Sequence, residues 1–356
     1  MIYKSAGITW STGGTETPNM AFLKRNGPRG GRNIVERVRV ESSLNYTTDG
    51  ATTMAAADLA SSLKKLRVYD QKGPRRYLSG MKIRTKAFED LRATAPADPA
   101  SIAISQTNTN RVFQHVVSFK QPIEHDPDDC LMPVDLFLDG GGITIEMPAN
   151  SDLKATGGTP TIVSGTYTIY VHCREDFDVQ LYQRDVVVDE IQKSDTALHV
   201  PLNGNMLKSL VLQKDAAGGG LATTTVTDVT LEGLNLIVIP RSQLKEEYLS
   251  QGVTRTADDP FYNDKALSVF FRKDGHKWAD SPRLGGDTLI RLTSTMATPD
   301  VIYHVVFPQD EDLNAVQAVR NGKRPDAGRS VKTVRGTRKN PSAWGQLSAF
   351  VRQKIG

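Results

Sequence analysis

The sequence Leu63-Lys64-Lys65-Leu66-Arg67-Val68 returns later in the chain as Leu207-Lys208-Ser209-Leu210-Val211-Leu212. Three further pairs of segments recur in the same order, with spacings of roughly 130 to 150 residues. These pairs are Leu78 to Ile83 with Leu231 to Leu236, Gly141-Gly142 with Gly285-Gly286, and Ile169 to His172 with Ile302 to Val305. Four pairs in one order indicate an internal duplication. Independent strands that share an apolar composition are the alternative.

The duplication predicts where particular residues lie. We expect residues 63–68 and residues 207–212 to occupy equivalent strands in two superposable units. We also expect Gly80 and Gly233 to lie at matching points, where a strand bends or approaches another backbone closely.

The segments around these repeats have the pattern of antiparallel strands. Short runs rich in Val, Ile, Thr, Tyr and Phe alternate with clusters of Gly, Pro, Asn and Asp. Helical periodicity is confined to residues 54–63, 242–249, 312–320 and 342–355. The predicted strands are residues 34–47, 66–70, 81–86, 112–119, 143–147, 166–173, 197–202, 207–213, 229–239, 266–272, 288–292 and 301–307.

The strand pattern predicts an all-β fold with two jelly-roll β-barrels or sandwiches in one chain, short helices and basic terminal extensions. The predicted divisions are a basic N-terminal arm at 1–33, a first jelly roll at 34–193, a second at 194–312 and a basic C-terminal extension at 313–356. The connection at 175–195 contains apolar runs, so we expect the two units to pack together.

Charge is distributed unevenly along the chain. The net charge is +4, yet residues 313–356 hold ten Lys or Arg against the single acid Asp326. Residues 1–37 are also basic, so the body between the two ends is acidic. This asymmetry favours contact between the ends and an anionic partner, nucleic acid or lipid headgroups. A pair of solvated tails is the alternative.

The C-terminal extension contains a predicted amphipathic helix. Trp344, Leu347, Val351 and Ile355 fall on one helical face. Such a helix can lie on anionic lipid, dock on a neighbouring subunit or pack on its own body. The predicted nucleic-acid or membrane contacts are Arg320, Lys323, Arg324, Arg329, Lys332, Arg335, Arg338, Lys339, Trp344, Arg352 and Lys354.

No catalytic constellation is visible in the sequence. It lacks a phosphate-binding Gly-Lys-Ser or Gly-Lys-Thr loop, a Gly-x-Ser-x-Gly elbow and a His-Glu-x-x-His helix. Histidines 115, 172, 199 and 304 lie within strand patterns, which is typical of structural, hydrogen-bonded histidines. Cys130 and Cys173 are too few for a disulfide framework and read as buried free thiols. We expect no enzymatic activity and no cofactor.

One acidic segment is a weak candidate for a cation-binding loop. Its carboxylates are Glu124, Asp126, Asp128 and Asp129. Oxygen-rich loops bind calcium, but the spacing lacks the motif of a helical calcium hand, so a solvated acidic loop is favoured. The pair Glu124 and Asp126 gives no evidence of the geometry that a glycosidase needs.

Two stretches resemble a known family. Residues 56–70, a helical turn running into a strand, are followed by a strand at 79–88, and residues 200–210 open the second unit in a similar way. The order of elements over 34–307 resembles the major capsid proteins of tailless, membrane-containing icosahedral bacteriophages of the tectivirus and corticovirus type. The resemblance implies two jelly rolls per chain and three chains per pseudo-hexagonal capsomer. The two ends match nothing in this family pattern.

The predicted function is therefore a major capsid protein that self-assembles as pseudo-hexameric trimers into an icosahedral virion shell. The expected partners are two further copies, neighbouring capsomers, penton and minor capsid proteins, and internal membrane lipid or packaged genome through the basic termini. The start of the chain lacks a signal-peptide pattern, so we expect assembly in the host cytoplasm.

Two other functions stay open. They are a cell-surface or tail-associated carbohydrate-binding β-sandwich, and a β-sandwich glycan hydrolase or lyase. Sugar sites usually need exposed rings, whereas 7% of residues are aromatic and Trp10, Trp278 and Trp344 are scattered.

Overall fold

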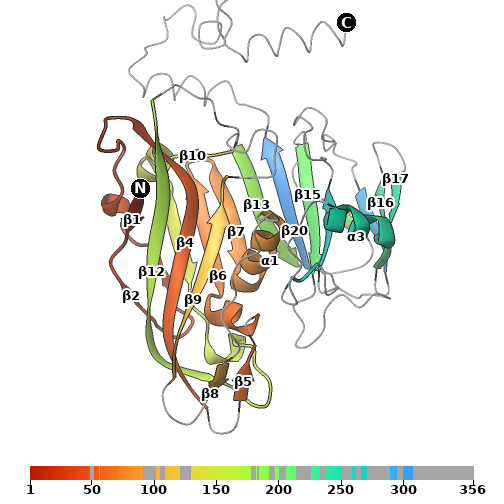
Figure 1. Ribbon diagram of the computed structural model, residues 1–356, viewed down its shortest axis with the longest axis horizontal. Helices are drawn as coiled ribbons and strands as arrows, with labels where there is room; N and C mark the ends of the chain where they lie inside the picture. Colours follow the sequence, from red (N-terminus) through yellow and green to blue (C-terminus); the bar gives the residue numbers. More distant parts are fainter. Residues whose placement is uncertain are drawn as a thin grey trace, which may run out of the picture.

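The fold consists of two β units side by side, joined through one sheet (Figure 1). A computed structural model describes residues 1–48, 52–55, 57–90, 102–104, 109–120, 130–177, 182, 184–191, 197–199, 206–213, 226–232, 237–250, 259–261, 266–270, 289–294 and 300–307.

The described elements of the first unit run from the N-terminus to residue 176. They are β1 (Ile2–Lys4), β2 (Ile8–Thr9), β3 (Thr15–Glu16), η1 (Met20–Phe22), β4 (Arg32–Thr47), β5 (Thr52–Met54), η2 (Asp58–Ser62), β6 (Lys65–Asp70), β7 (Gly73–Ser79), α1 (Gly80–Asp90), β8 (Ile102–Ile104), β9 (Thr109–Ser118), β10 (Met132–Pro133), α2 (Asp135–Leu138), β11 (Gly142–Glu146), η3 (Asn150–Asp152) and β12 (Thr161–Asp176). Strands dominate, as the sequence predicts.

The second unit begins at residue 184. Its described elements are β13 (Arg184–Ile191), β14 (Ala197–His199), β15 (Met206–Gln213), β16 (Val226–Glu232), β17 (Ile237–Pro240), α3 (Arg241–Ser250), β18 (Ala266–Phe270), β19 (Leu289–Ser294) and β20 (Asp300–Phe307). The helix α3 matches the helix predicted at 242–249.

The second unit has the strand order of a jelly roll, a fold of eight strands conventionally lettered B to I. A jelly roll places strands B, I, D and G in one sheet and C, H, E and F in the other. Lettering β13 to β20 in chain order as B to I gives both orders: β13-β20-β15-β18 lie side by side, and so do β14-β19-β16-β17. The helix α3 follows strand F.

The first unit has the same order. The strands β1 and β2 together act as B, β12 as I, β4 as D and β9 as G, while β3-β11-β6-β7 form the other sheet as C, H, E and F. The helix α1 again follows strand F. Residues 1–33, predicted as a basic arm, thus supply strands to both sheets, because Ile2 pairs with His172 and Glu16 pairs with Ile145.

Alternating side chains explain the core of the first unit. Along β4, Val38 and Val40 are fully buried while Arg37 and Arg39 face outward, which is the two-residue period of a strand with one buried face. The strand β12 pairs with β4 almost along its whole length and buries Ile169 and Val171. These side chains pack with buried residues of β6 and β11 in one core.

The strand predicted at 81–86 is wrong, because these residues form part of α1. Met81, Ile83 and Thr85 alternate with polar residues, which imitates a strand. In the helix, Ile83 and Ala87 lie one turn apart and are both buried. The helix lies between the two units and is buried on nearly all sides (Figure 1). Its charged residues therefore do not mark a solvent-exposed face.

Of the four pairs of recurring segments, two lie at corresponding places in the two units and two do not. The repeats at 169–172 and 302–305 lie in the two I strands, β12 and β20. Gly141-Gly142 lies at the start of strand H, β11, and Gly285-Gly286, outside the described residues, precedes the other H strand, β19, in the sequence. The expected equivalence of 63–68 and 207–212 is wrong, since the first lies largely in β6 (strand E) and the second in β15 (strand D). The expected match of 78–83 with 231–236 is also wrong, since Leu78 lies in β7 (strand F) and Leu231 in β16 (strand E). Gly80 therefore does not match Gly233, which lies outside the described residues, but the close approach predicted at Gly80 is confirmed.

Candidate functional site at the junction of the two units

The two units meet where β7 and β13 run parallel in one sheet. Arg76 lies opposite Val187 and Tyr77 opposite Val188, and these two pairs are the backbone register between the strands. This pairing joins β7, an edge strand of the first unit, to β13, an edge strand of the second unit. The result is one eight-stranded sheet with the order β18-β15-β20-β13-β7-β6-β11-β3. We use the name junction network for the buried charged side chains around this join, defined as Asp70, Arg75, Arg76, Arg184, Asp185 and His304.

Asp185 lies at the centre of the junction network. Its side chain is fully buried, and its two carboxylate oxygens accept hydrogen bonds from Arg75 Nη2 at 2.8 Å and Arg76 Nη2 at 2.7 Å. Its backbone carbonyl accepts a third, from Arg75 Nε, at 2.7 Å. His304 Nε2 from β20 lies 3.1 Å from the same carboxylate. One acid of the second unit therefore binds two arginines of the first.

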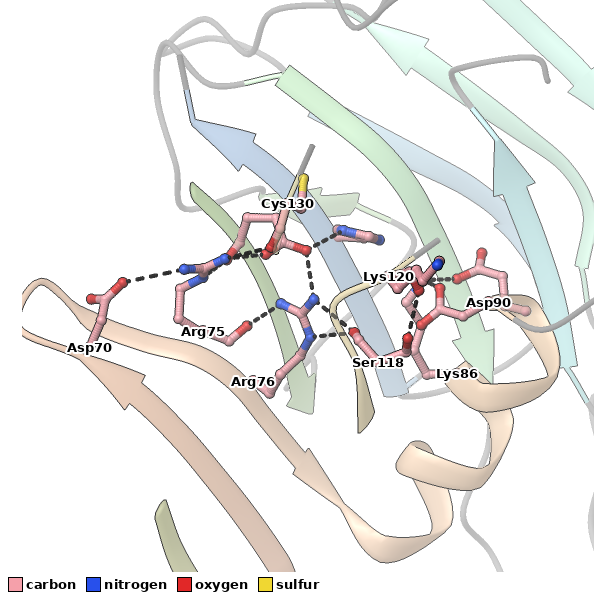
Figure 2. Close-up of polar contacts among 11 residues, drawn as sticks. Asp70, Arg75, Arg76, Lys86, Asp90, Ser118, Lys120 and Cys130 are labelled. Atoms are coloured by element: carbon pink, nitrogen blue, oxygen red, sulfur yellow. Dashed lines mark hydrogen bonds and ion pairs between the residues drawn. The ribbon is translucent and has the colours of Figure 1, made fainter. Parts of the chain in front are cut away.

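The two arginines are anchored further within the first unit (Figure 2). Arg76 Nη2 donates to the carbonyl of Ser118 at 2.9 Å, and Arg75 Nη2 donates to the carbonyl of Cys130 at 3.1 Å. The guanidinium of Arg76 also lies over the ring of Phe119, 4.3 Å from its centroid. These contacts within the first unit hold both guanidinium groups in position for Asp185.

A second acid completes the network from the side of the first unit. Arg184 Nε donates to Asp70 Oδ2 at 3.0 Å, and Arg184 Nη2 donates to the carbonyl of Pro74 at 3.1 Å. Asp70 also lies 3.7 Å from Arg75 Nη1. Each unit thus contributes both signs of charge across the join.

Electrostatics keep the central acid ionised. Burial alone raises the pKa of Asp185, but the positive charges of Arg76 and Arg75, with the hydrogen bond to His304, hold that pKa well below its usual range. Burial lowers the pKa of Arg184, and the negative charge of Asp70 opposes this effect.

A second buried cluster lies at the end of α1. Glu89, almost fully buried, accepts hydrogen bonds from Ser268 Oγ on β18 at 2.6 Å and from Ser209 Oγ on β15 at 3.3 Å. Lys86 pairs with Glu89 and, at 2.6 Å, with Asp90. Burial lowers the pKa of Lys86, but the two carboxylates raise it above its usual value. The helix of the first unit is thus hydrogen-bonded to the second unit.

The buried ion pairs and hydrogen bonds of this arrangement join the two units. The carboxylates of Asp70 and Asp185 pair with arginine, and the carboxylate of Glu89 pairs with Lys86 and accepts hydrogen bonds from two serine hydroxyls. Within the described ranges, no group of three or more His, Cys, Asp or Glu is placed to hold a metal ion. The same ranges contain no helix long and apolar enough to cross a membrane.

The junction network was not predicted from the sequence. The available signal was the adjacent pair Arg75-Arg76 inside a strand, together with Asp185 directly before the apolar run Val186-Val187-Val188. Charged residues inside strands usually face solvent. Without knowing the partner strand, these charged residues could not be told apart from residues on a solvent-exposed face of a sheet.

The residues predicted as sites lie elsewhere. The acidic segment with Glu124, Asp126, Asp128 and Asp129, and every predicted contact from Arg320 to Lys354, lie outside the described residues. The two cysteines are buried free thiols, which confirms that prediction. Histidines 115, 172, 199 and 304 lie in β9, β12, β14 and β20. His115 Nε2 lies 3.0 Å from Ser62 Oγ and His304 contacts Asp185, consistent with structural roles.

Solved structures of known proteins are similar to this fold. Neither a family model nor a curated protein matches the sequence. The fold matches the major capsid protein of Sulfolobus turreted icosahedral virus, with 13% identity over 87% of this chain and 98% of that chain, and a TM-score of 0.58. It also matches the major capsid protein P2 of bacteriophage PM2, with 9% identity, coverage of 86% and 96%, and a TM-score of 0.53.

A third similar structure comes from the capsid of PBCV-1 virus. It shares 10% identity over 87% of this chain and 95% of that chain, with a TM-score of 0.52. All three matches extend over most of both chains. The chain therefore has the double jelly-roll fold seen in viral major capsid proteins.

Proposed function

We propose that this chain is the major capsid protein of an icosahedral virus and acts as a structural subunit, not as an enzyme. The observation that carries the proposal is the pair of jelly rolls with the same strand order, joined in one chain through one sheet. Structures of capsid proteins from three viruses resemble this arrangement over nearly their whole length. The protein would then reside in the virion capsid after assembly in the host cytoplasm.

The proposed assembly unit is a homotrimer. Three chains with two similar rolls each place six similar units around a threefold axis, which gives a pseudo-hexameric outline. Such capsomers would contact one another and, at special positions, penton and minor capsid proteins. Among described residues the exposed large hydrophobic side chains are Met1, Ile2, Val112, Val163 and Phe177. With one aromatic ring in this set, the described surface gives no support to a carbohydrate-binding module.

The finer assignment, to the tectivirus and corticovirus type of phage, is also part of the proposal. Support comes from the likeness to the capsid protein of bacteriophage PM2, with a TM-score of 0.53, beside 0.58 for the protein of Sulfolobus turreted icosahedral virus. The proposed domain division keeps a C-terminal extension at 313–356. Because β1 pairs with β12 and β3 pairs with β11, we include the N-terminal residues in the first roll. Because β13 pairs with β20, we start the second roll at Arg184.

The basic C-terminal extension is proposed to contact phosphate groups of packaged nucleic acid or of an internal membrane. Its support is the excess of basic residues at 313–356. Binding of the full chain and of a version ending at Asp312 to DNA and to anionic liposomes, at low and high salt, tests this. Phosphate contacts weaken steeply with salt, whereas burial of Trp344 and Val351 in lipid would leave a salt-resistant part. Equal binding by both versions would contradict the proposal.

The assembly proposal is tested on the purified full chain. Light scattering should give a particle of three times 39.0 kDa, and negative-stain images should show hexagonal outlines. A monomer across the micromolar range would contradict the proposed function.

A further inference from the structure

We propose that the junction network makes the two rolls one cooperative body, and that Asp185 is the positioning residue that sets their mutual orientation. The effect of this orientation on trimer formation rests on the proposed function. The cooperativity of the two rolls does not depend on it.

The backbone contribution to the join is small. The strands β7 and β13 share two residue pairs, whereas β13 pairs with β20 along eight residues and β4 pairs with β9 along ten. Parallel pairing is also slightly weaker per residue than antiparallel pairing. Backbone hydrogen bonds alone would leave the two rolls free to rock about a short seam.

Side chains across the seam supply the missing constraint. Asp185 of β13 binds the guanidinium groups of Arg75 and Arg76 on β7. Four residues along β13, Asp189 accepts a hydrogen bond from the backbone N–H of Ser79 at 2.8 Å and pairs with Lys65 at 3.1 Å. The contacts at both positions join the second roll to the first, so they oppose rotation about either one.

These contacts are directional, which apolar contacts are not. A small rotation of β13 against β7 would lengthen the hydrogen bonds to a fully buried carboxylate and draw that anion away from the buried guanidinium of Arg76, while Arg75 would keep Asp70 at 3.7 Å. Unpaired buried charge is strongly unfavourable, so the network tolerates one orientation. Apolar packing, by contrast, accepts small shifts with little loss.

A fixed orientation has a consequence for assembly. A ring of three chains closes only if the angle between the two rolls matches the rotation that relates neighbouring chains. A chain whose rolls rock about the seam samples many angles and reaches the closing angle for part of the time. Asp185 therefore favours the trimer without touching another chain.

The experiment compares three variants of the full chain by calorimetry and by sedimentation. Asp185→Asn removes the central charge, and Arg76→Lys keeps a charge but removes the planar fork that reaches both Asp185 and Ser118. Ile169→Ala, in the core of the first roll and outside the junction network, is the control with a similar loss of thermal stability.

We expect one unfolding transition for the wild-type chain and for Ile169→Ala, and two separated transitions for Asp185→Asn. We expect the trimer association constant of Asp185→Asn to fall at least tenfold below that of Ile169→Ala. If Asp185→Asn does not fold, Arg76→Lys gives the same two readings in weaker form.

A single transition and unchanged trimer formation in the junction variants would overturn the inference. A wild-type chain that stays monomeric would contradict the proposed capsid function, yet the number of transitions would still test the coupling of the rolls. The two failures are thus distinguishable.

Discussion

Gly80 lies against the backbone of Leu63, with its N–H donating to the Leu63 carbonyl at 3.1 Å. A β-carbon on Gly80 would lie 2.4 Å from that oxygen and 2.1 Å from the carbonyl oxygen of Ala60. Both neighbours are backbone atoms that cannot rotate away. Glycine is therefore required where β7 ends and α1 begins, at the edge of the inter-unit junction.

This contact predicts that Gly80→Ala destabilises the protein by more than about 2 kcal/mol, because the backbone must shift to relieve the overlap. Gly7→Ala is the matched control, since nothing lies within 4 Å of the β-carbon it adds. Chemical denaturation of both variants measures the effect. Equal midpoints for the two would contradict the close approach.

The buried cluster at the end of α1 gives a second prediction. Glu89→Gln removes the charge that faces Lys86 and weakens the acceptor of Ser209 and Ser268. We expect a loss of about 1 to 3 kcal/mol, because a charged buried hydrogen-bond partner is lost while Asp90 still pairs with Lys86. Glu16→Gln, an exposed carboxylate on β3, should change the unfolding free energy by less than about 0.5 kcal/mol. A similar small change in both variants would rule out an energetic role for the cluster.

The buried histidine His115 predicts a pH dependence of stability. Burial lowers its pKa to about 3 in the folded state, against an ordinary value of 6.5. The unfolded chain therefore takes up a proton first as the pH falls, so His115 destabilises the fold progressively between pH 6.5 and about 3. The slope approaches about 1.4 kcal/mol per pH unit in this window.

Denaturation of the wild type and of His115→Gln at pH 7.5, 6 and 5 measures this slope. The variant retains a polar group near Ser62 but cannot titrate, so its stability should change less over the same range. Identical pH profiles would show that His115 does not carry the effect. Asp185 contributes in a different window: its pKa is depressed in the fold, so its stabilisation is lost only as the pH falls below about 4.

The burial of the two cysteines predicts that their thiols are protected from reagents in solution. Cys130 and Cys173 are 1% and 2% exposed, and burial raises the pKa of Cys173 to about 12. At pH 8 neither should react with a thiol reagent in the folded protein, since both sulfur atoms are covered and the reactive thiolate of Cys173 is scarce. Thr9→Cys, at an exposed position of β2, should react within minutes and shows that the reagent is active. Fast labelling of the wild type would contradict the burial.

The interior of the first roll could largely be predicted from the sequence. The strand predicted at 34–47 is confirmed as β4, with Val38 and Val40 buried, since a two-residue period is a local property of the chain. The junction could not be predicted, because Arg75 and Asp185 are separated by more than a hundred residues and nothing local distinguishes a buried charge from an exposed one.

By itself, the sequence determined that the chain is mostly β, that it contains two similar units, and that the segments at 169–172 and 302–305 correspond. Tertiary structure alone decided that 81–86 is a helix, that the N-terminal residues complete the first roll, and that 63–68 and 207–212 are different strands. The physical reason is the distance along the chain over which each effect acts. Alternation and turn residues act between neighbours in the chain, whereas strand order and the burial of charge depend on partners that only the folded chain brings together.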